Sequence, residues 1–413
     1  MIDESLPGFI RGSLDHCVKC NICETACPVM NVTPLFPGPK YEGPQAERFR
    51  TPGASADDSI DYCSGCGICT LVCPQGVKVA EINSRARATM KQQRGIPLRD
   101  HLLARPSVEG RLATPLAPLA NLALSNRGIR LLIEKTLRIH RQAPLPKFAG
   151  LTFQGWARRH QPPPTDDAVV YFHGCSTNYF QPELGVQAVA VLEHNGFRVL
   201  VPPQDCCGLP LQSNGIFDTA RSYVSRLARN LAPYARQGYK IVATSTSCGL
   251  MLKREALEIL GMEDDQDLRV VSEQTYDICE FLADLDEQGR LRSDFNSLPI
   301  TVTYHAPCQQ QSHLIGKPAL DLLDLIPELK VIELDRACCG IAGTYGTKRE
   351  KYDVAMQVGA GLFGDIRDAG PDLAVCDSET CRWQITHGTG RESVHPVEIL
   401  HQAYGLGSRA RRK

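Results

Sequence analysis

The sequence predicts a mixed α+β and α/β chain, in which a small helical N-terminal unit precedes two copies of an α/β domain. The N-terminal unit is indicated by a pattern of four cysteines and a proline that occurs twice, at 17–28 and 63–74. The duplication is indicated by a Cys-Cys-Gly motif whose flanking segments recur after about 130 residues. Strand-like apolar runs alternate with helical stretches in both copies, which is typical of a largely parallel sheet.

The composition restricts the class of protein. The chain of 413 residues carries 45 basic and 46 acidic residues, so its net charge gives no indication of nucleic-acid binding. Its 18 cysteines follow no apolar export signal, and in a reducing compartment clustered cysteines indicate metal or redox chemistry rather than disulfides. No apolar run approaches the ~18 residues of a membrane-spanning helix. We therefore expect neither a signal peptide nor a transmembrane helix.

The first cysteine pattern, CVKCNICETACP, has the spacing C-x2-C-x2-C-x3-C-P of bacterial ferredoxins. In that arrangement three closely spaced thiolates hold one four-iron cluster, and the fourth cysteine reaches the other cluster of the pair. The second pattern, CSGCGICTLVCP, starts 46 residues later with the same spacing. We predict two [4Fe–4S] clusters, site 1 held by Cys17, Cys20, Cys23 and Cys73, and site 2 held by Cys63, Cys66, Cys69 and Cys27. Zinc is the alternative metal, but it favours two CxxC pairs on separate loops.

Residues 96–165 contain no cysteine and have a largely helical pattern, with proline-rich breaks at 143–147 and 161–167. Within this region the segment 125–142 has one apolar and one basic face. The apolar face contains Ile129, Leu132, Ile133 and Leu137, and the basic face contains Arg127, Arg130, Arg138 and Arg141. Such a helix either lies on an anionic bilayer surface or packs on this protein or a partner with its arginines in solvent.

Beyond residue 165 the duplicated domains place their cysteines mostly just after strand-like runs. The runs 169–174, 197–202 and 240–246 of the first copy correspond to 300–306, 329–335 and 372–378 of the second. Loops that follow parallel strands gather at the carboxyl edge of the sheet, so we expect the cysteines of each copy to meet there. We predict a first CCG site of Cys175, Cys206, Cys207 and Cys248, and a second CCG site of Cys308, Cys338, Cys339 and Cys381. Four thiolates per copy suit one or two further iron–sulfur clusters. Buried, inert cysteine is the alternative, which we apply to Cys279.

Two further features repeat in both copies. Adjacent cysteines followed by Gly208 or Gly340 present two sulfurs at a tight turn, whose backbone geometry glycine permits. His173 and His305 lie two and three residues before the first cysteine of their copy. They are candidates for proton transfer next to a quinone or a cluster, with capping or core histidines as the alternative.

With two ferredoxin-type runs followed by two CCG domains, the sequence resembles the iron–sulfur subunits of glycolate oxidase, lactate-utilisation enzymes and heterodisulfide reductase. The stretches PLFPGPKYEGPQAERFR, at 34–50, and CCGIAGTYG, at 338–346, make it more similar to the C subunits of bacterial anaerobic glycerol-3-phosphate dehydrogenases. One departure is that CCG domains typically end in CxxC, whereas Ser245 and Ser378 replace the first cysteine here. A four-cysteine site per copy is therefore expected instead of a five-cysteine, noncubane cluster, with Cys376 as a candidate replacement in the second copy.

The resemblance implies electron transfer in anaerobic respiration and glycerol metabolism. In such enzymes the flavin-containing subunits A and B oxidise glycerol 3-phosphate, and the C subunit passes the electrons to menaquinone at the cytoplasmic face of the inner membrane. We therefore expect a peripheral, membrane-associated, non-dehydrogenating subunit that is a candidate site of quinone reduction. The sequence has no G-x-G-x-x-G after a strand, no P-loop and no HExxH motif, which agrees with substrate chemistry on a partner. The alternative is the iron–sulfur subunit of a glycolate or lactate oxidase or of a heterodisulfide-reductase-like complex.

These patterns also predict the domain boundaries. We expect a ferredoxin-type domain over 1–95, a helical linker for membrane or partner contact over 96–165, the first CCG domain over 166–298, the second CCG domain over 299–405 and a basic tail over 406–413.

Overall fold

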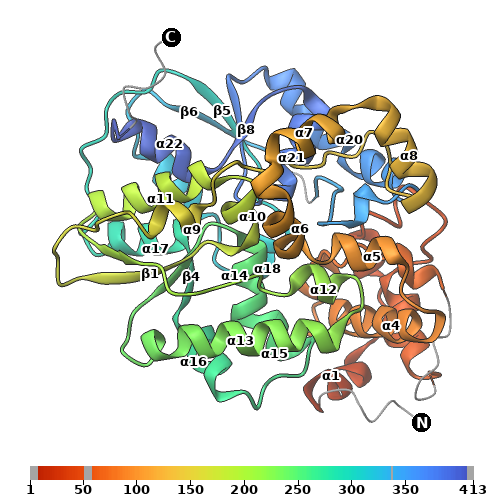
Figure 1. Ribbon diagram of the computed structural model, residues 1–413. Helices are drawn as coiled ribbons and strands as arrows, with labels where there is room; N and C mark the ends of the chain where they lie inside the picture. Colours follow the sequence, from red (N-terminus) through yellow and green to blue (C-terminus); the bar gives the residue numbers. More distant parts are fainter. Residues whose placement is uncertain (1–7, 51–57, 336–337, 407–413) are drawn as a thin grey trace.

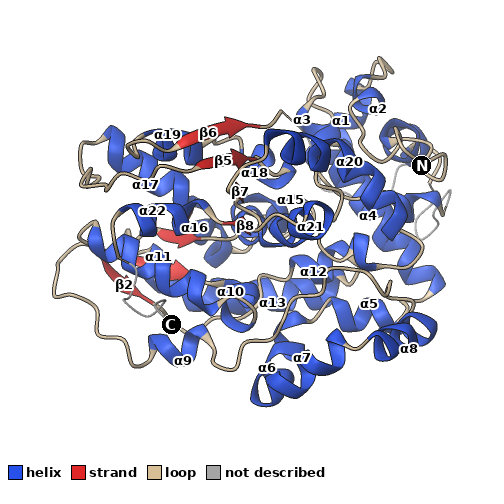
Figure 2. Cartoon of the chain, turned by 90° about the horizontal axis from the view of Figure 1, so that it is seen from above, coloured by secondary structure: helices blue, strands red, loops and turns tan. Residues whose placement is uncertain are grey.

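The computed structural model describes residues 8–50, 58–335 and 338–406 (Figure 1). Residues 1–7 of the predicted ferredoxin-type domain and 407–413 of the predicted basic tail lie outside this range. The helical N-terminal unit, red to orange in Figure 1, lies against two α/β domains. In Figure 2 the strands of the two domains form two groups on one side of the molecule, and the N-terminal helices lie on the other. The predicted fold class is confirmed.

The N-terminal unit consists of short helices around two cysteine loops. Its helices are α1 (Gly8–Ser13), α2 (Ile22–Thr25), α3 (Ile68–Leu71) and α4 (Val79–Arg94). Left-handed backbone precedes α2 at Lys19 and Asn21, and precedes α3 at Gly65 and Gly67. A backbone with positive φ is strained for most residues that carry a side chain and unstrained for glycine. Both loops nevertheless adopt this conformation at matching positions. The repeated cysteine spacing therefore corresponds to a repeated loop geometry.

A run of helices connects the N-terminal unit to the first α/β domain. They are α5 (Leu98–Leu103), α6 (Pro106–Ala113), α7 (Ala117–Ser125), α8 (Arg127–Leu137) and α9 (Phe153–Ala157). Gly110 of α6 lies so close to Tyr179 that an added Cβ would be 2.3 Å from Tyr179 Cγ, so glycine allows α6 to lie against the first α/β domain. Within the described ranges, none of the helices is both long and apolar enough to cross a bilayer.

The first α/β domain is built on a parallel four-stranded sheet. Its strands are β1 (Ala168–Phe172), β2 (Arg198–Leu200), β3 (Ile241–Ala243) and β4 (Thr275–Asp277), in the order β2-β1-β3-β4. Its helices are α10 (Gly174–Tyr179), α11 (Pro182–His194), α12 (Leu209–Ser213), α13 (Phe217–Ala235), α14 (Thr246–Leu250), α15 (Ala256–Glu258), α16 (Gln266–Gln274) and α17 (Ile278–Glu287). β1 pairs in parallel with β2, with Ala168 opposite Arg198, and with β3, with Val170 opposite Ile241. Its apolar side chains are buried, as expected for an inner strand of a parallel sheet.

The second α/β domain repeats this arrangement. Its strands are β5 (Thr301–Tyr304), β6 (Lys330–Glu333), β7 (Leu373–Val375) and β8 (Ser393–Val394), in the order β6-β5-β7-β8 and with parallel pairing. Its helices are α18 (Cys308–His313), α19 (Pro318–Asp324), α20 (Tyr352–Ala369), α21 (Glu379–Thr389) and α22 (Pro396–Ala403). The six predicted strands are present. β4 and β8 were not predicted, because Thr275, Asp277 and Ser393 leave no apolar run in either strand.

A single apolar core joins the two α/β domains. It contains Tyr171 and Val242 of the first sheet together with Tyr304, Val375 and Leu400 of the second domain. Across the boundary, α11 packs on α22 and α17 packs on α19. Each Å² of apolar surface removed from water stabilises this contact by about 25 cal/mol. The shared core therefore holds the strand ends of both sheets, and the cysteines that follow them, in one relative position.

Candidate metal centres and the cavity between them

Site 1 lies near the surface of the N-terminal unit. The residues Cys17, Cys20, Cys23 and Cys73 line one cavity of about 20 Å³. Cys20 is exposed, Cys17 and Cys73 are half-buried, and only Cys23 is buried. Burial, followed by the charges of Glu24 and of the neighbouring thiols, raises the pKa of Cys23 to about 11. The structure brings the four cysteines of site 1 together at a place that another protein can reach.

Site 2 is more deeply buried than site 1. Cys27, Cys63 and Cys69 are buried and Cys66 is half-buried. Burial raises the pKa of all four thiols, that of Cys27 to about 11, and thiols within the set raise one another's pKa further. Arg87 donates from Nη1 to the Cys63 carbonyl oxygen at 2.6 Å and opposes the rise at Cys63. The fourth cysteine of each run thus lies with the cysteines of the other run.

The first CCG site lies at the carboxyl edge of the first sheet. Cys175 is in the first turn of α10, Cys206 and Cys207 precede α12, and Cys248 is in α14. The sulfurs of Cys175 and Cys206 are 3.8 Å apart, and those of Cys207 and Cys248 are 3.3 Å apart. Gly208 has a φ of 85°, and its N–H donates to Cys206 Sγ at 3.5 Å. The Cys-Cys-Gly turn therefore brings both sulfurs to the cysteines that follow β1 and β3.

The second CCG site has the same construction at the second sheet. Cys308 begins α18, Cys338 and Cys339 follow β6, and Cys381 is in α21. The sulfurs of Cys339 and Cys381 are 3.1 Å apart, and the N–H of Gly340 donates to Cys338 Sγ at 3.3 Å. Gly340 has a φ of 87°, and an added Cβ would lie 1.9 Å from the carbonyl oxygen of Ala355. Glycine is therefore required at this position by both conformation and space.

The two CCG sites differ in the number of thiols. Ser245 caps α14, where its Oγ accepts from the N–H of Cys248 at 3.3 Å. In the second copy Cys376, which directly follows β7, is fully buried and its thiol hydrogen-bonds with that of Cys381. The matching residue of the first copy is Ala243. Five thiols therefore gather at the second CCG site and four at the first.

The chemistry of these residues fits iron–sulfur clusters. Each of the 18 cysteines is a free thiol, and all but Cys279 and Cys376 belong to one of the four predicted groups. Soft thiolates in groups of four are the ligands of four-iron clusters. Burial favours the neutral thiol, and a bound metal ion is what holds such a thiol deprotonated.

Site 2 lies directly against the second CCG site. Cys66 belongs to one apolar cluster with Cys308 and Cys338. Burial, followed by the charge of Cys338, raises the pKa of Cys66, so the two thiols interact across the domain boundary. An added Cβ on Gly67 would lie 2.5 Å from Ser312 Oγ of α18, so glycine allows this approach. This contact was not predicted, because no sequence spacing relates the two sites.

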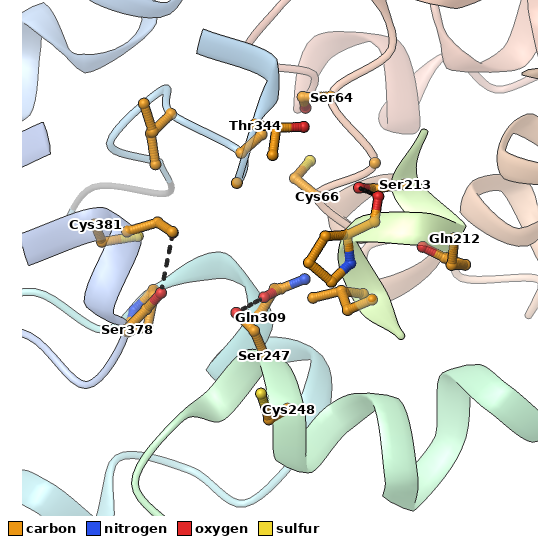
Figure 3. Close-up of a pocket in the computed structure, with 18 of the residues that line it drawn as sticks. Ser64, Cys66, Gln212, Ser213, Ser247, Cys248, Gln309, Thr344, Ser378 and Cys381 are labelled. Carbon is orange, nitrogen blue, oxygen red and sulfur yellow. Dashed lines mark hydrogen bonds between the residues drawn. The ribbon is translucent and has the colours of Figure 1, made fainter. Parts of the chain in front are cut away.

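A cavity of about 220 Å³ lies between site 2 and the two CCG sites (Figure 3). Figure 3 shows Cys66, Cys248 and Cys381 around it, on three different parts of the chain. Apolar side chains of the wall include Leu103, Pro106, Pro144, Leu145, Phe180 and Trp383. Glu109 of α6 also lines the cavity, and burial raises its pKa to about 7. The arrangement can hold a planar, apolar molecule next to redox-active thiol sites.

The two predicted histidines are buried beside the sheets. The Nδ1 of His173 lies 2.6 Å from the carbonyl oxygen of Gly174, and burial lowers the pKa of His173 to about 4. Burial also lowers the pKa of His305. Neither residue is part of the cavity wall described above, whereas Glu109 is. Contact of His173 and His305 with a quinone stays a prediction.

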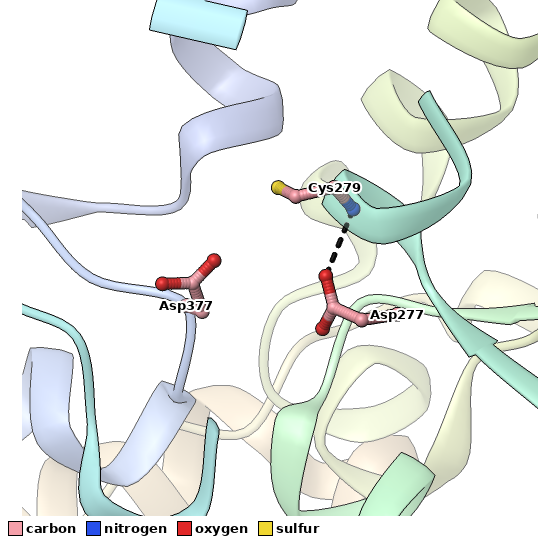
Figure 4. Close-up of side chains that lie close together, drawn as sticks. All are labelled: Asp277, Cys279 and Asp377. Carbon is pink, nitrogen blue, oxygen red and sulfur yellow. Dashed lines mark hydrogen bonds between the residues drawn. The ribbon is translucent and has the colours of Figure 1, made fainter. Parts of the chain in front are cut away.

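A buried acidic pair lies at the boundary between the two α/β domains (Figure 4). Asp277 accepts from the N–H of Cys279 at 2.8 Å, and Asp377 accepts from the hydroxyl of Tyr304 at 2.8 Å. Ligand atoms of Asp277, Cys279 and Asp377 lie within 4.8 Å of one another. Burial, followed by the opposing carboxyl, raises the pKa of Asp277, and burial raises that of Asp377 to about 6. Cys279 therefore lies beside an acidic pair rather than in a purely apolar core.

The predicted amphipathic segment is helical over α8, and its most exposed apolar residue is Leu132. Ile133 and Leu137 are half-buried. The preceding helices α6 and α7 and the turn between them add further exposed leucines. We call the five leucines that are 60–73% exposed the leucine ridge, which consists of Leu112, Leu116, Leu119, Leu122 and Leu132. The structure thus extends the exposed apolar surface beyond the predicted segment.

Two protein-family models match this chain. Residues 13–77 match the 4Fe-4S dicluster domain, and residues 169–253 and 302–386 each match the cysteine-rich domain called CCG. The matched ranges contain all cysteines of sites 1 and 2 and of both CCG sites. The chain is therefore an iron–sulfur protein with two CCG domains.

The relatives agree with this organisation. The chain is 40% identical to the C subunit of the anaerobic glycerol-3-phosphate dehydrogenase of Escherichia coli, over 95% of this chain and 98% of that protein. It is 30% identical to the B subunit of the fumarate reductase (CoM/CoB) of Methanothermobacter marburgensis, over 56% of this chain and 44% of that protein. It is 28% identical to lactate utilization protein A of Geobacillus kaustophilus, over 58% of this chain and 99% of that protein. Because the first match extends over the cysteine loops, the helical connection and both α/β domains, the chain belongs to the family of C subunits of anaerobic glycerol-3-phosphate dehydrogenase.

Proposed function

We propose that this chain carries electrons from a flavin-containing glycerol-3-phosphate dehydrogenase to menaquinone. The observation that supports the proposal most directly is the contact of Cys66 in site 2 with Cys308 and Cys338 in the second CCG site. Iron–sulfur clusters accept and release single electrons. A route for electrons needs neighbouring sites that touch, and this contact supplies one between the N-terminal unit and the α/β domains.

The ligands in this proposal are the four groups of thiols. Site 1 and site 2 each hold one [4Fe–4S] cluster, the first CCG site offers four thiols, and the second CCG site offers a fifth in Cys376. The corresponding division of the chain is 1–95, 96–165, 166–298, 299–405 and 406–413. It assigns each group of thiols either to the ferredoxin-type domain or to one CCG domain.

The exposure of the sites suggests a direction for the electrons. Cys20 of site 1 is exposed, so site 1 is accessible to a partner. Cys23 of site 1 and Cys69 of site 2 lie in one apolar cluster, which connects the two sites. Site 2 is enclosed and contacts the second CCG site. We therefore place the entry at site 1 and the exit at the CCG domains.

Flavoprotein subunits A and B are the proposed partners. In this scheme glycerol 3-phosphate is oxidised on the partner, and this chain contributes no residue to that step. The half-exposed cysteine loop of site 1, 17–23, is the surface that a donor would cover. The partner thus docks on the N-terminal unit.

The leucine ridge is the proposed contact with the cytoplasmic face of the inner membrane. Exposed leucines on consecutive helices are the kind of apolar surface that marks a contact with a protein or a membrane. Exposed Arg111, Arg127 and Lys135 lie on α6 and α8, and each basic residue near an anionic lipid surface contributes about 1 kcal/mol. Apolar and basic faces on the same helices favour a peripheral position in the interface.

The test is electron delivery by the complex. The chain would be co-produced with its flavoprotein subunits, purified anaerobically, and assayed for iron, sulfide and menaquinone reduction driven by glycerol 3-phosphate. About sixteen irons are expected if both CCG sites hold four-iron clusters, and about eight if only sites 1 and 2 do. The same assay with lactate or glycolate as the electron donor distinguishes this function from that of a lactate or glycolate oxidase.

Cys66→Ser is the informative variant, because it disturbs the contact between site 2 and the second CCG site. It should leave flavin reduction by glycerol 3-phosphate intact and stop menaquinone reduction. Cys279→Ser, at a buried cysteine outside the four groups, is the matched control and should behave like the wild type. Menaquinone reduction at the wild-type rate in Cys66→Ser would refute the proposed route.

A further inference from the structure

We propose that the cavity between site 2 and the two CCG sites is the quinone site, and that Glu109 donates a proton to the bound quinone. This inference rests on the proposed function, since the electrons must come from the iron–sulfur sites. It assigns a place and a proton donor to a reaction that the chain's cysteines alone do not explain.

The walls of the cavity suit a quinone ring. The wall contains cysteines of three sites, including Cys66, Cys248 and Cys381 (Figure 3). It also contains apolar side chains such as Leu103, Pro106 and Trp383, together with charged ones, among them Arg87 and Arg254. A flat, largely apolar ring with two polar oxygens fits a cavity that is mostly apolar and offers a few polar groups. A ligand there would lie between the electron source and the helices α5 and α6.

Glu109 is suited to proton donation by its surroundings. Its side chain lines the cavity, and among the residues that the structure describes its carboxyl has neither a hydrogen-bond nor an ion-pair partner. Burial, with no charged neighbour to oppose it, raises its pKa to about 7. A carboxyl group that is protonated near neutral pH and faces a ligand can act as a general acid.

Helix α6 also connects the cavity to the proposed membrane contact. Pro106 and Glu109 of α6 line the cavity, while Val108 and Leu112 of the same helix are exposed. Leu112 belongs to the leucine ridge. Helix α6 therefore contributes residues both to the cavity wall and to the surface proposed to contact the bilayer in which a quinone is dissolved.

The chemistry balances with groups already named. Reduction of a quinone to a quinol adds one electron and one proton to each of the two carbonyl oxygens. Both electrons come from the substrate oxidised on the partner and arrive through the cysteine sites. Glu109 supplies the proton for one oxygen and is reprotonated from water, and water supplies the proton for the other.

Binding is tested by filling the cavity. Leu103→Trp places a larger side chain in the wall, and Leu102→Trp changes the neighbouring residue, which is 38% exposed and is not part of the wall. Fluorescence quenching of a hydroxyquinoline N-oxide, a quinone analogue, measures binding to the iron-loaded complex. We expect at least tenfold weaker binding, equivalent to about 1.4 kcal/mol, for Leu103→Trp and no change for Leu102→Trp. Equal binding in both variants would overturn the assigned site.

Proton donation is tested by Glu109→Gln, with Glu183→Gln at an exposed position of α11 as the control. General acid catalysis contributes about 10²-fold or more, so menaquinone reduction should fall about 10²-fold in Glu109→Gln. Analogue binding and reduction of the iron sites by glycerol 3-phosphate should change less than threefold, and Glu109→Asp should recover part of the rate. An unchanged rate in Glu109→Gln would refute the role of Glu109. If the wild-type complex reduced its iron sites but no quinone, the proposed function itself would be wrong.

Discussion

The two α/β domains share a fold but differ in what surrounds their cysteines. Both have four parallel strands in the same order and a Cys-Cys-Gly turn with a left-handed glycine. Among the residues that the structure describes, it is the cysteines of the second domain, Cys308 and Cys338, that contact site 2, and the second CCG site has an additional thiol, Cys376, where the first has Ala243. Both copies thus have the same sheet and the same turn, whereas the packing of the domains places one copy next to site 2.

The two domains also differ in how they are held to the N-terminal unit and to the helices that follow it. Lys351 of the second domain pairs with Asp61 at 2.6 Å, and Lys348 pairs with Asp100 at 2.9 Å, all largely shielded from water. The first domain makes a more exposed pair between Lys78 and Glu258 at 3.2 Å. A buried ion pair is favourable only when its charged groups lie close together and make all their hydrogen bonds. The buried pairs therefore fix the position of the second domain more strictly than the exposed pair fixes that of the first.

The largest expected difference concerns electron transfer. Cys338→Ser should prevent glycerol 3-phosphate from reducing either CCG site, because in the proposed route electrons enter the CCG domains from site 2 through the second site. Cys206→Ser, at the matching position of the first domain, should leave the second CCG site reducible. EPR spectra of the complex after stepwise reduction show which CCG sites are reduced in each of the two variants. Loss of all CCG signals in Cys206→Ser with retention in Cys338→Ser would reverse the order of the two domains.

The second difference concerns stability. Burial alone would raise the pKa of Asp100, but Lys348 and Lys91 outweigh it and lower the pKa to about 2. Asp100→Asn leaves these buried lysines without their carboxylate, and breaking such a group costs roughly 3–5 kcal/mol. Glu258→Gln in the first domain should cost less than about 1 kcal/mol, as surface pairs do. Thermal unfolding of the two iron-loaded variants compares them, and equal Tm values would contradict the difference in anchoring.

The third difference concerns the additional thiol. If Cys376 is a ligand or supports Cys381 as one, Cys376→Ala should weaken iron binding at the second CCG site about tenfold, as the loss of a supporting group does. Retained iron under a competing chelator is the measurement. Cys279→Ala removes an equally buried thiol outside the four groups and should retain all iron. Identical iron retention in the two variants would mean that Cys376 only fills space.

The smallest expected effect lies at the acidic pair between the domains. The raised pKa of Asp277 means that the folded state binds its proton more tightly than the unfolded state, so this group's contribution to stability is lost as pH rises above about 4. Asp277→Asn keeps the helix cap and removes this loss, so it should stabilise the protein by about 1 kcal/mol at pH 8 and by less at pH 5.5. Asp265→Asn, a cap on α16, is the control. Equal Tm changes at both pH values would exclude coupling between the two aspartates.

The iron–sulfur character and the duplicated fold could be predicted from local sequence. Ligand spacing in the runs 17–28 and 63–74 depends on a short chain segment wrapped around one centre, so it is visible in the sequence. The strands around the Cys-Cys-Gly turns lie in apolar runs that can be recognised, apart from β4 and β8. The resemblance to the C subunits came from further local stretches, 34–50 and 338–346.

The contacts between domains were decided only in the tertiary structure. The approach of Cys66 to Cys338, the cavity wall formed by Leu103 and Glu109, and the pairing of Asp277 with Asp377 each join residues far apart in the chain. No periodicity or spacing links such positions, because they are brought together by the packing of whole domains. The sequence by itself determined which residues can hold iron, whereas the packing of the domains decided which sites touch and what lies between them.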